Sequence, residues 1–325
     1  MENKRVFEKR KFYNSDDSGK MFLTVILFQI LVSLVLSLVA NRIASVQGVD
    51  ISVITSSPWF VIVQSLILIL MYGLIFFLFN SLQGVSYSAA KIKFKVKWHY
   101  YFVAIFVGAI ALFGLQYFVG IADEVLDKLG YPLDNSSLVS STSFGSFVLS
   151  VFSLAVIPAI GEELIFRGVV FNGLRKHYSL TSSILISSLL FALMHLSLQQ
   201  FVYPFLLGMI MAWIVARTGS IVCSMVVHFV NNFFVILQSY LYKIYGFSLA
   251  LPSTWWYYLV AIGLLLTVGG IILLLDKYYF KKQSNNDVER DENEKPSKFV
   301  IIAIVIGVAL LITFTILNIV SAKIE

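Results

Sequence analysis

Runs of about 17–25 predominantly apolar residues recur along almost the whole 325-residue chain. At a rise of ~1.5 Å per residue, such a run crosses a hydrocarbon core of roughly 30 Å as a helix. Only helices satisfy their own backbone hydrogen bonds when a segment in lipid is this uniformly apolar. The sequence therefore predicts an all-α, polytopic transmembrane helix bundle of about eight to nine spans. They are expected at Met21–Ala40, Trp59–Phe79, Phe102–Ile121, Phe144–Phe166, Thr181–Leu196, Phe201–Val215, Ile221–Tyr240, Trp255–Leu275 and Phe299–Ser321.

Composition supports the membrane assignment and excludes an ordinary soluble domain. The chain is 58% hydrophobic and only 13% charged, with a mean hydropathy of +0.86. We expect four parts: a basic cytoplasmic tail at 1–20, N-terminal transmembrane helices at 21–142, a core at 143–245, and C-terminal transmembrane helices at 255–325. The last part includes a polar cytoplasmic linker at 276–298.

The distribution of lysine and arginine predicts the orientation in the membrane. With a cytoplasmic N-terminus, all but four of the 24 basic residues fall in cytoplasmic segments, the exceptions being Arg42, Lys128, Lys243 and Lys323. This is the asymmetry expected of membrane proteins, and nine spans place the C-terminus outside. The net charge of +6 is then explained by topology and by anionic lipids as partners, with no nucleic acid.

Ionisable residues interrupt three of the apolar segments. Charged or titratable groups are costly at membrane depth and usually face a bundle interior or a wet cavity. Glu163 and Arg167 have the order and spacing of an i,i+4 ion pair, which predicts structural support for their helix. Adjacent helical residues point ~100° apart, so we expect that Glu162 and Glu163 cannot both face one site and that Glu162 is left free.

Matched depth predicts that the remaining candidates meet. Glu162 lies sixteen residues before Tyr178, and His195 lies seventeen after it, so a helical hairpin turning there brings both to a similar height. His228 lies nine residues beyond Gly219, or ~14 Å, which is close to the same depth. Its neighbour one helical turn later, Asn232, shares its helical face.

These residues carry a resemblance to a known family. Glu-Glu-x-x-x-Arg at Glu162–Arg167, Phe-x-x-x-His at Phe191–His195 and His-x-x-x-Asn at His228–Asn232 occur in order on successive hydrophobic helices. They resemble the motifs of the CAAX-protease and bacteriocin-processing (CPBP or ABI) intramembrane endopeptidases, which include CAAX prenyl protease 2-like enzymes. The resemblance covers about a third of the chain and implies peptide-bond hydrolysis inside the membrane, close to its cytoplasmic side.

Residue chemistry allows two versions of that reaction. In the favoured, glutamate-type version no cofactor is needed: Glu162 and His195 activate a water, while His228 and Asn232 stabilise the oxyanion. In the alternative, Glu162, His195 and His228 hold a zinc ion that activates the water. The sequence lacks the His-Glu-x-x-His spacing that would speak directly for zinc.

Substrate and biological role stay open at the level of sequence. The resemblance implies a peptide or lipidated peptide in the membrane, and in bacterial relatives a role in bacteriocin processing or immunity. Lysine- and asparagine-containing polar segments and the lack of a targeting signal favour a bacterial plasma membrane. A non-catalytic immunity or scaffold protein, or a transporter, is the alternative, although no internal symmetry typical of transporters is present.

Overall fold

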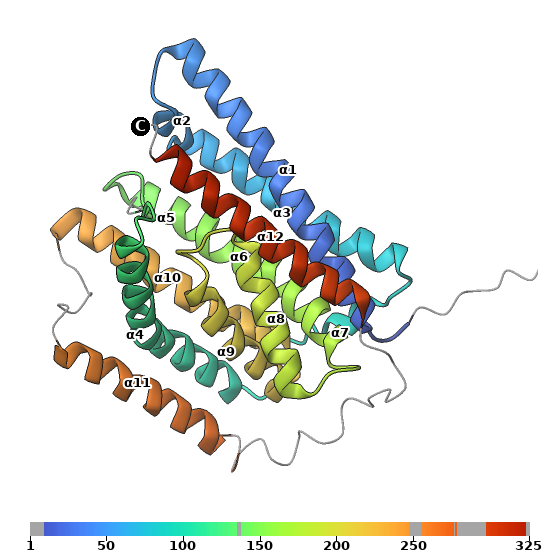
Figure 1. The fold of residues 1–325 in the computed structure, drawn as a ribbon. Helices are drawn as coiled ribbons and strands as arrows, with labels where there is room; N and C mark the ends of the chain where they lie inside the picture. The colour runs from blue at the N-terminus through green and yellow to red at the C-terminus, as the bar shows by residue number, and fades with distance from the viewer. Residues whose placement is uncertain (1–9, 135–137, 247–254, 276, 278–296, 323–325) are drawn as a thin grey trace, which may run out of the picture.

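A computed structural model describes residues 10–134, 138–246, 255–275, 277 and 297–322 of the chain. Within these ranges the protein is a bundle of helices without a β-strand, and one isolated bridge joins Arg10 to Val85 (Figure 1). The elements are α1 (Ser15–Gln47), α2 (Ile51–Thr55), α3 (Pro58–Leu82), η1 (Tyr87–Ala90), α4 (His99–Lys128), α5 (Phe144–Val151), η2 (Phe152–Val156), α6 (Ile157–Glu163), η3 (Leu164–Phe171), α7 (Asn172–Leu174), α8 (Leu180–Met194), α9 (Val202–Thr218), α10 (Ile221–Tyr245), α11 (Trp255–Leu274) and α12 (Lys298–Ser321).

The prediction of a polytopic all-α membrane bundle is confirmed, with a helical segment at each predicted span. Six helical segments of the described chain are long and apolar enough to cross a membrane. The first begins at Ser15, earlier than the predicted Met21, because the Asn14 side chain accepts the Asp17 N–H and Asp17 reciprocates in a capping box. The predicted span Met21–Ala40 lies inside this longer helix.

Helices α8 and α9, at 15 and 17 residues, are apolar but shorter than the six segments long enough to cross a membrane. Fifteen residues rise about 22 Å, less than the roughly 30 Å of a hydrocarbon core. The connection between them, at residues 195–201, is therefore expected to lie within the bilayer rather than beyond it. His195 is the first residue after α8, so it is presented at the tip of a recessed hairpin.

The predicted hairpin before α8 is present, but its first arm is irregular. Helical structure runs from Phe144 to Leu174, interrupted by the π-helical stretches η2 and η3. Proline at position 158 has no N–H for the Leu154 carbonyl four residues earlier, which accounts for the loosened backbone around η2. π-Helical turns are rare and often occur at functional sites, and here η3 starts directly after Glu163.

One end of the bundle gathers basic residues. Helices α1 and α12 start side by side there, since the Ser297 hydroxyl donates to Asp16 over 2.6 Å (Figure 1). At the same end, the Lys176 ammonium lies 3.7 Å from the centre of the Phe12 ring. We call this the basic end. Because α12 runs parallel to α1, its last residue lies at the opposite end, as an odd number of crossings requires.

Candidate active site

The predicted ion pair between Glu163 and Arg167 is present and fully buried. Arg167 Nη1 lies 2.9 Å from Glu163 Oε1, with both side chains at most 1% exposed. Arg167 Nη2 donates to the Gly208 carbonyl over 3.1 Å, and the guanidinium lies 4.4 Å from the centre of the Phe191 ring. Arg167 therefore ties η3 to α9 and α8, which is the structural support expected from the sequence.

His228 of α10 lies between the two glutamates. Its Nδ1 atom is 3.2 Å from Glu163 Oε1, and its Nε2 atom is 3.9 Å from Glu162 Oε2. The prediction that the two glutamates cannot serve one site is therefore wrong. The physical reason is the imidazole itself, whose two nitrogens face different directions, so that residues pointing apart on one helix meet the same ring.

The charge of the neighbouring Arg167 indicates which atom donates and which accepts the hydrogen bond between His228 and Glu163. Glu163 pairs with Arg167 and so acts as a carboxylate that accepts from His228 Nδ1–H. The Nε2 atom is left to face Glu162. The buried cluster thus pairs two carboxyl groups with a guanidinium and an imidazole, which limits the cost of burial.

Glu162 is held by a residue that the sequence analysis missed. The Tyr72 hydroxyl of α3 donates to Glu162 Oε1 over 3.3 Å, while Oε2 is buried and accepts no hydrogen bond within the described chain. A Cβ atom at Gly161 would lie 2.3 Å from the Tyr72 ring, so glycine is needed for this packing. A buried tyrosine inside an apolar span was the available signal, because its hydroxyl needs a partner.

His195 is oriented by the helix that it ends. Its Nδ1 atom lies 3.0 Å from the Phe191 carbonyl, which identifies Nδ1 as the donor and leaves Nε2 for the site. The Phe191 ring lies edge-on to both His195 and His228, with centroids 5.2 and 6.0 Å apart. No hydrogen bond joins His195 to Glu162 in the described structure. His228 thus lies beside Glu162, and both histidines contact the Phe191 ring, whereas the convergence of all three residues stays a prediction.

Asn232 donates a hydrogen bond to a backbone carbonyl that Pro158 leaves without a helical partner. Its Nδ2 atom donates to the Leu154 carbonyl over 3.0 Å, the same carbonyl that Pro158 leaves without its usual α-helical donor. The second Nδ2 hydrogen is not used in that bond. Asn231, by contrast, is fully buried and donates to the Tyr203 hydroxyl over 2.6 Å. Asn231 therefore packs against α9 and is not expected to tolerate alanine.

A cavity of about 470 Å³ gives access to the site, and we call it the vestibule. His195 and Asn232 lie in its wall together with Tyr203. Asp134 and Gln199 also line it, and the Asp134 N–H donates to Gln199 Oε1. These two residues belong to connections at the end of the bundle opposite the basic end. The vestibule therefore lies toward the face from which α12 emerges.

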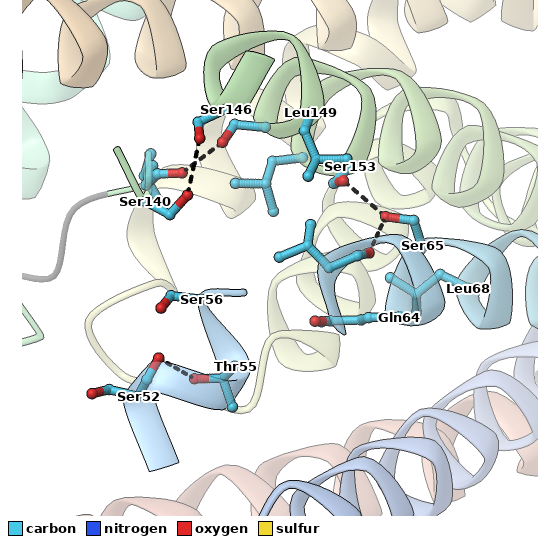
Figure 2. Close-up of a pocket in the computed structure, with 14 residues that line it drawn as sticks. Ser52, Thr55, Ser56, Gln64, Ser65, Leu68, Ser140, Ser146, Leu149 and Ser153 are labelled. Carbon is cyan, nitrogen blue, oxygen red and sulfur yellow. Dashed lines mark hydrogen bonds between the residues drawn. The ribbon is translucent and has the colours of Figure 1, made fainter. Parts of the chain in front are cut away.

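A separate cavity of about 400 Å³ is lined by hydroxyl groups and by no charged residue (Figure 2). Figure 2 shows Ser65 and Ser153 hydrogen-bonded across it, with Oγ atoms 2.8 Å apart. It shares Leu138 and Leu154 with the vestibule but contains none of the candidate catalytic residues. The candidate catalytic residues His195 and Asn232 therefore line the vestibule and not this second cavity.

A protein zinc site needs three or four side-chain ligands within reach of one ion. Within the described residues, no group of three His, Cys, Asp or Glu side chains lies close enough together to hold a metal. The Nδ1 atoms of both histidines are engaged, by a backbone carbonyl and by Glu163. The side chains as placed do not fit a three-residue zinc site, so we route no chemical step through a metal.

Comparison with known proteins identifies the relatives of this segment. Residues 144–234 match the family described as "Type II CAAX prenyl endopeptidase Rce1-like". The resemblance inferred from the motifs is confirmed over this segment. It contains Glu162, His195, His228 and Asn232, whereas Tyr72 and the helices α1 and α12 lie outside it.

Two curated bacterial proteins are similar to parts of the chain. "Putative membrane peptidase YdiL" of Bacillus subtilis (strain 168) is 27% identical over 129 residues, which are 40% of this chain and 52% of that protein. "UPF0177 protein YxdF" of Lactococcus lactis subsp. lactis (strain IL1403) is 32% identical over 84 residues, 26% of this chain and 46% of that protein. The chain thus spans about half the length of the curated relatives it matches. No solved structure matches it significantly.

Proposed function

We propose that the protein is an intramembrane endopeptidase of the glutamate type. The observation that carries the proposal is the buried cluster in which His228 lies between Glu162 and Glu163, with His195 beside it in the wall of the vestibule. The similarity to a protein named as a membrane peptidase supports the reaction class. A scaffold would gain nothing from burying four ionisable groups at membrane depth, where each is costly.

Water activation is assigned to Glu162 and His195. Glu162 Oε2 has no other acceptor role in the described structure, and His195 Nε2 is the free nitrogen of an oriented ring. Together they remove a proton from a water that attacks the peptide carbonyl, and they return that proton to the leaving amine. Tyr72 and Phe191 act as positioning residues, because they hold the Glu162 carboxylate and the His195 ring.

Oxyanion stabilisation is assigned to His228 and Asn232. In the proposed reaction His228 Nε2 donates one hydrogen bond to the oxyanion, and Asn232 offers its second Nδ2 hydrogen. Asn232→Ala is then expected to lower turnover by ~10²–10³-fold with little change in substrate affinity. Asn231→Ala should instead lower stability, because it removes a buried hydrogen bond to Tyr203.

The substrate proposed is a peptide or lipidated peptide held in the membrane, with anionic lipids bound at the basic end. A Glu162→Gln variant should retain substrate, since the amide cannot activate water but preserves the shape of the site. Peptides that co-purify with Glu162→Gln and not with wild type would be identified by mass spectrometry. Failure of both proteins to retain or cleave any membrane peptide would favour a non-catalytic immunity or scaffold protein.

The zinc-dependent version of the same protease makes a different prediction. Elemental analysis of active, purified protein would find one zinc per chain, and His228→Ala would lose that zinc together with activity. Activity that persists after treatment with a strong chelator supports the glutamate-type reaction.

A further inference from the structure

His195 lies in the walls of two cavities. Besides the vestibule, it lines a groove of about 440 Å³ that is bounded by α1 and α12. We call this the α1–α12 groove. Its walls include Gln29, Ser33 and Ser37 of α1, Phe314 of α12, and His195 with Leu196. The residue proposed to activate water therefore borders both cavities.

The groove presents polar groups on a helix that is otherwise strongly apolar. The most apolar window of α1 has a mean hydropathy of 2.7, yet Gln29, Ser33 and Ser37 recur every four residues on one face. Gln29 Nε2 donates to the Met194 carbonyl over 3.2 Å, which places its amide directly before His195. Gln29 Oε1 is buried and accepts no hydrogen bond within the described chain, and Ser33 and Ser37 are exposed.

The distance of the groove from the basic end places the groove within the hydrocarbon part of the membrane. Gln29 lies fourteen residues after the first residue of α1, a rise of about 21 Å from the basic end. Phe314 lies sixteen residues along α12, about 24 Å from the same end. Exposed Leu34 lines the groove next to Ser33, and exposed Leu27 lies on another face of α1. The groove thus opens sideways at a depth where the surroundings are hydrocarbon.

Resting on the proposed function, we infer that the α1–α12 groove holds the extended backbone of a membrane-embedded peptide substrate. The peptide passes His195 and continues into the vestibule. A peptide bond must leave helical structure to be attacked, and in lipid its N–H and C=O groups then lack partners, which is costly. Gln29 supplies an acceptor and Ser33 and Ser37 supply hydroxyl donors at that point. Gln29 is therefore a positioning residue for substrate, in a part of the chain outside the segment matched by the family.

Photo-crosslinking tests this inference without requiring turnover. The probe is a synthetic single-span peptide of leucine and alanine with a glycine- and proline-containing stretch at one end, reconstituted with Glu162→Gln protein in phosphatidylglycerol and phosphatidylethanolamine vesicles. A photoreactive residue at position 33 should capture the peptide about tenfold more than one at Leu27, which is exposed on another face of α1. Equal capture at the two positions would overturn the inference.

A second comparison, between Gln29→Leu and a control variant, tests the contribution of the Gln29 side chain to peptide capture. Gln29→Leu should lower capture at position 33 by about tenfold, the equivalent of one to two lost hydrogen bonds. Thr24→Val is the matched control, because Thr24 lines a different cavity and its hydroxyl donates to its own Lys20 carbonyl. An effect of Thr24→Val as large as that of Gln29→Leu would contradict the assignment.

The two proposals fail in different ways. Wild-type cleavage of the probe without capture at position 33 would reject the groove and leave the proposed protease intact. Capture at position 33 without cleavage of any membrane peptide by wild type would retain the groove and contradict the proposed function.

Discussion

Among single residues, Glu163 has two partners, Arg167 and His228, so its substitution is expected to have two effects. Glu163→Gln removes the charge that pairs with buried Arg167 and weakens the hold on His228 Nδ1. We expect a loss of unfolding free energy of about 3–5 kcal/mol, the cost of leaving a buried charge unpaired, together with lower activity. Thermal unfolding in detergent measures the first effect. The double variant Glu163→Gln/Arg167→Met should recover part of the stability, and a double variant less stable than Glu163→Gln would contradict this account.

At the scale of elements, the contact between α3 and α6 depends on Gly161. A Cβ there would overlap the Tyr72 ring, so Gly161→Ala should displace Tyr72 and with it Glu162. Overpacking of this kind costs about 1–3 kcal/mol, and activity should fall as well. Gly73→Ala on α3 is the control, because a Cβ at Gly73 meets no atom within 4 Å. If both alanine variants unfold at the same temperature as wild type and remain active, the contact is not required.

At the scale of the whole molecule, the orientation is tested by reporter fusions. Fusions after Lys95, after Lys176 and within residues 278–296 should report the cytoplasm, and a fusion after Lys323 should report the outside. Two contacts favour this outcome, since Ser297 hydrogen-bonds to Asp16 and Lys176 lies over the Phe12 ring. Because the vestibule lies toward the opposite end, this result also determines the side from which it is reached. A cytoplasmic signal after Lys323 would contradict the orientation.

Much of the architecture could be predicted from sequence, because long apolar runs leave a membrane chain little alternative to helices. The Glu163–Arg167 pair followed from helical spacing. The bridging of both glutamates by His228 could not be predicted, since it depends on how α10 packs against α6 and η3. Tyr72 and Gln29 were missed for the same reason, because each lies on a helix far from the motifs in sequence.

The central claim is that Glu162 activates water in a buried site, and an isosteric substitution tests it most directly. Wild type, Glu162→Gln and Glu124→Gln would be compared for new peptide termini, detected by mass spectrometry in membranes that contain equal amounts of each protein. Glu124 is an exposed glutamate paired with Lys128, so its substitution controls for loss of a carboxylate elsewhere. The account predicts cleavage by wild type and Glu124→Gln and a loss of ~10²–10⁴-fold for Glu162→Gln. Cleavage by Glu162→Gln at the wild-type rate would contradict it.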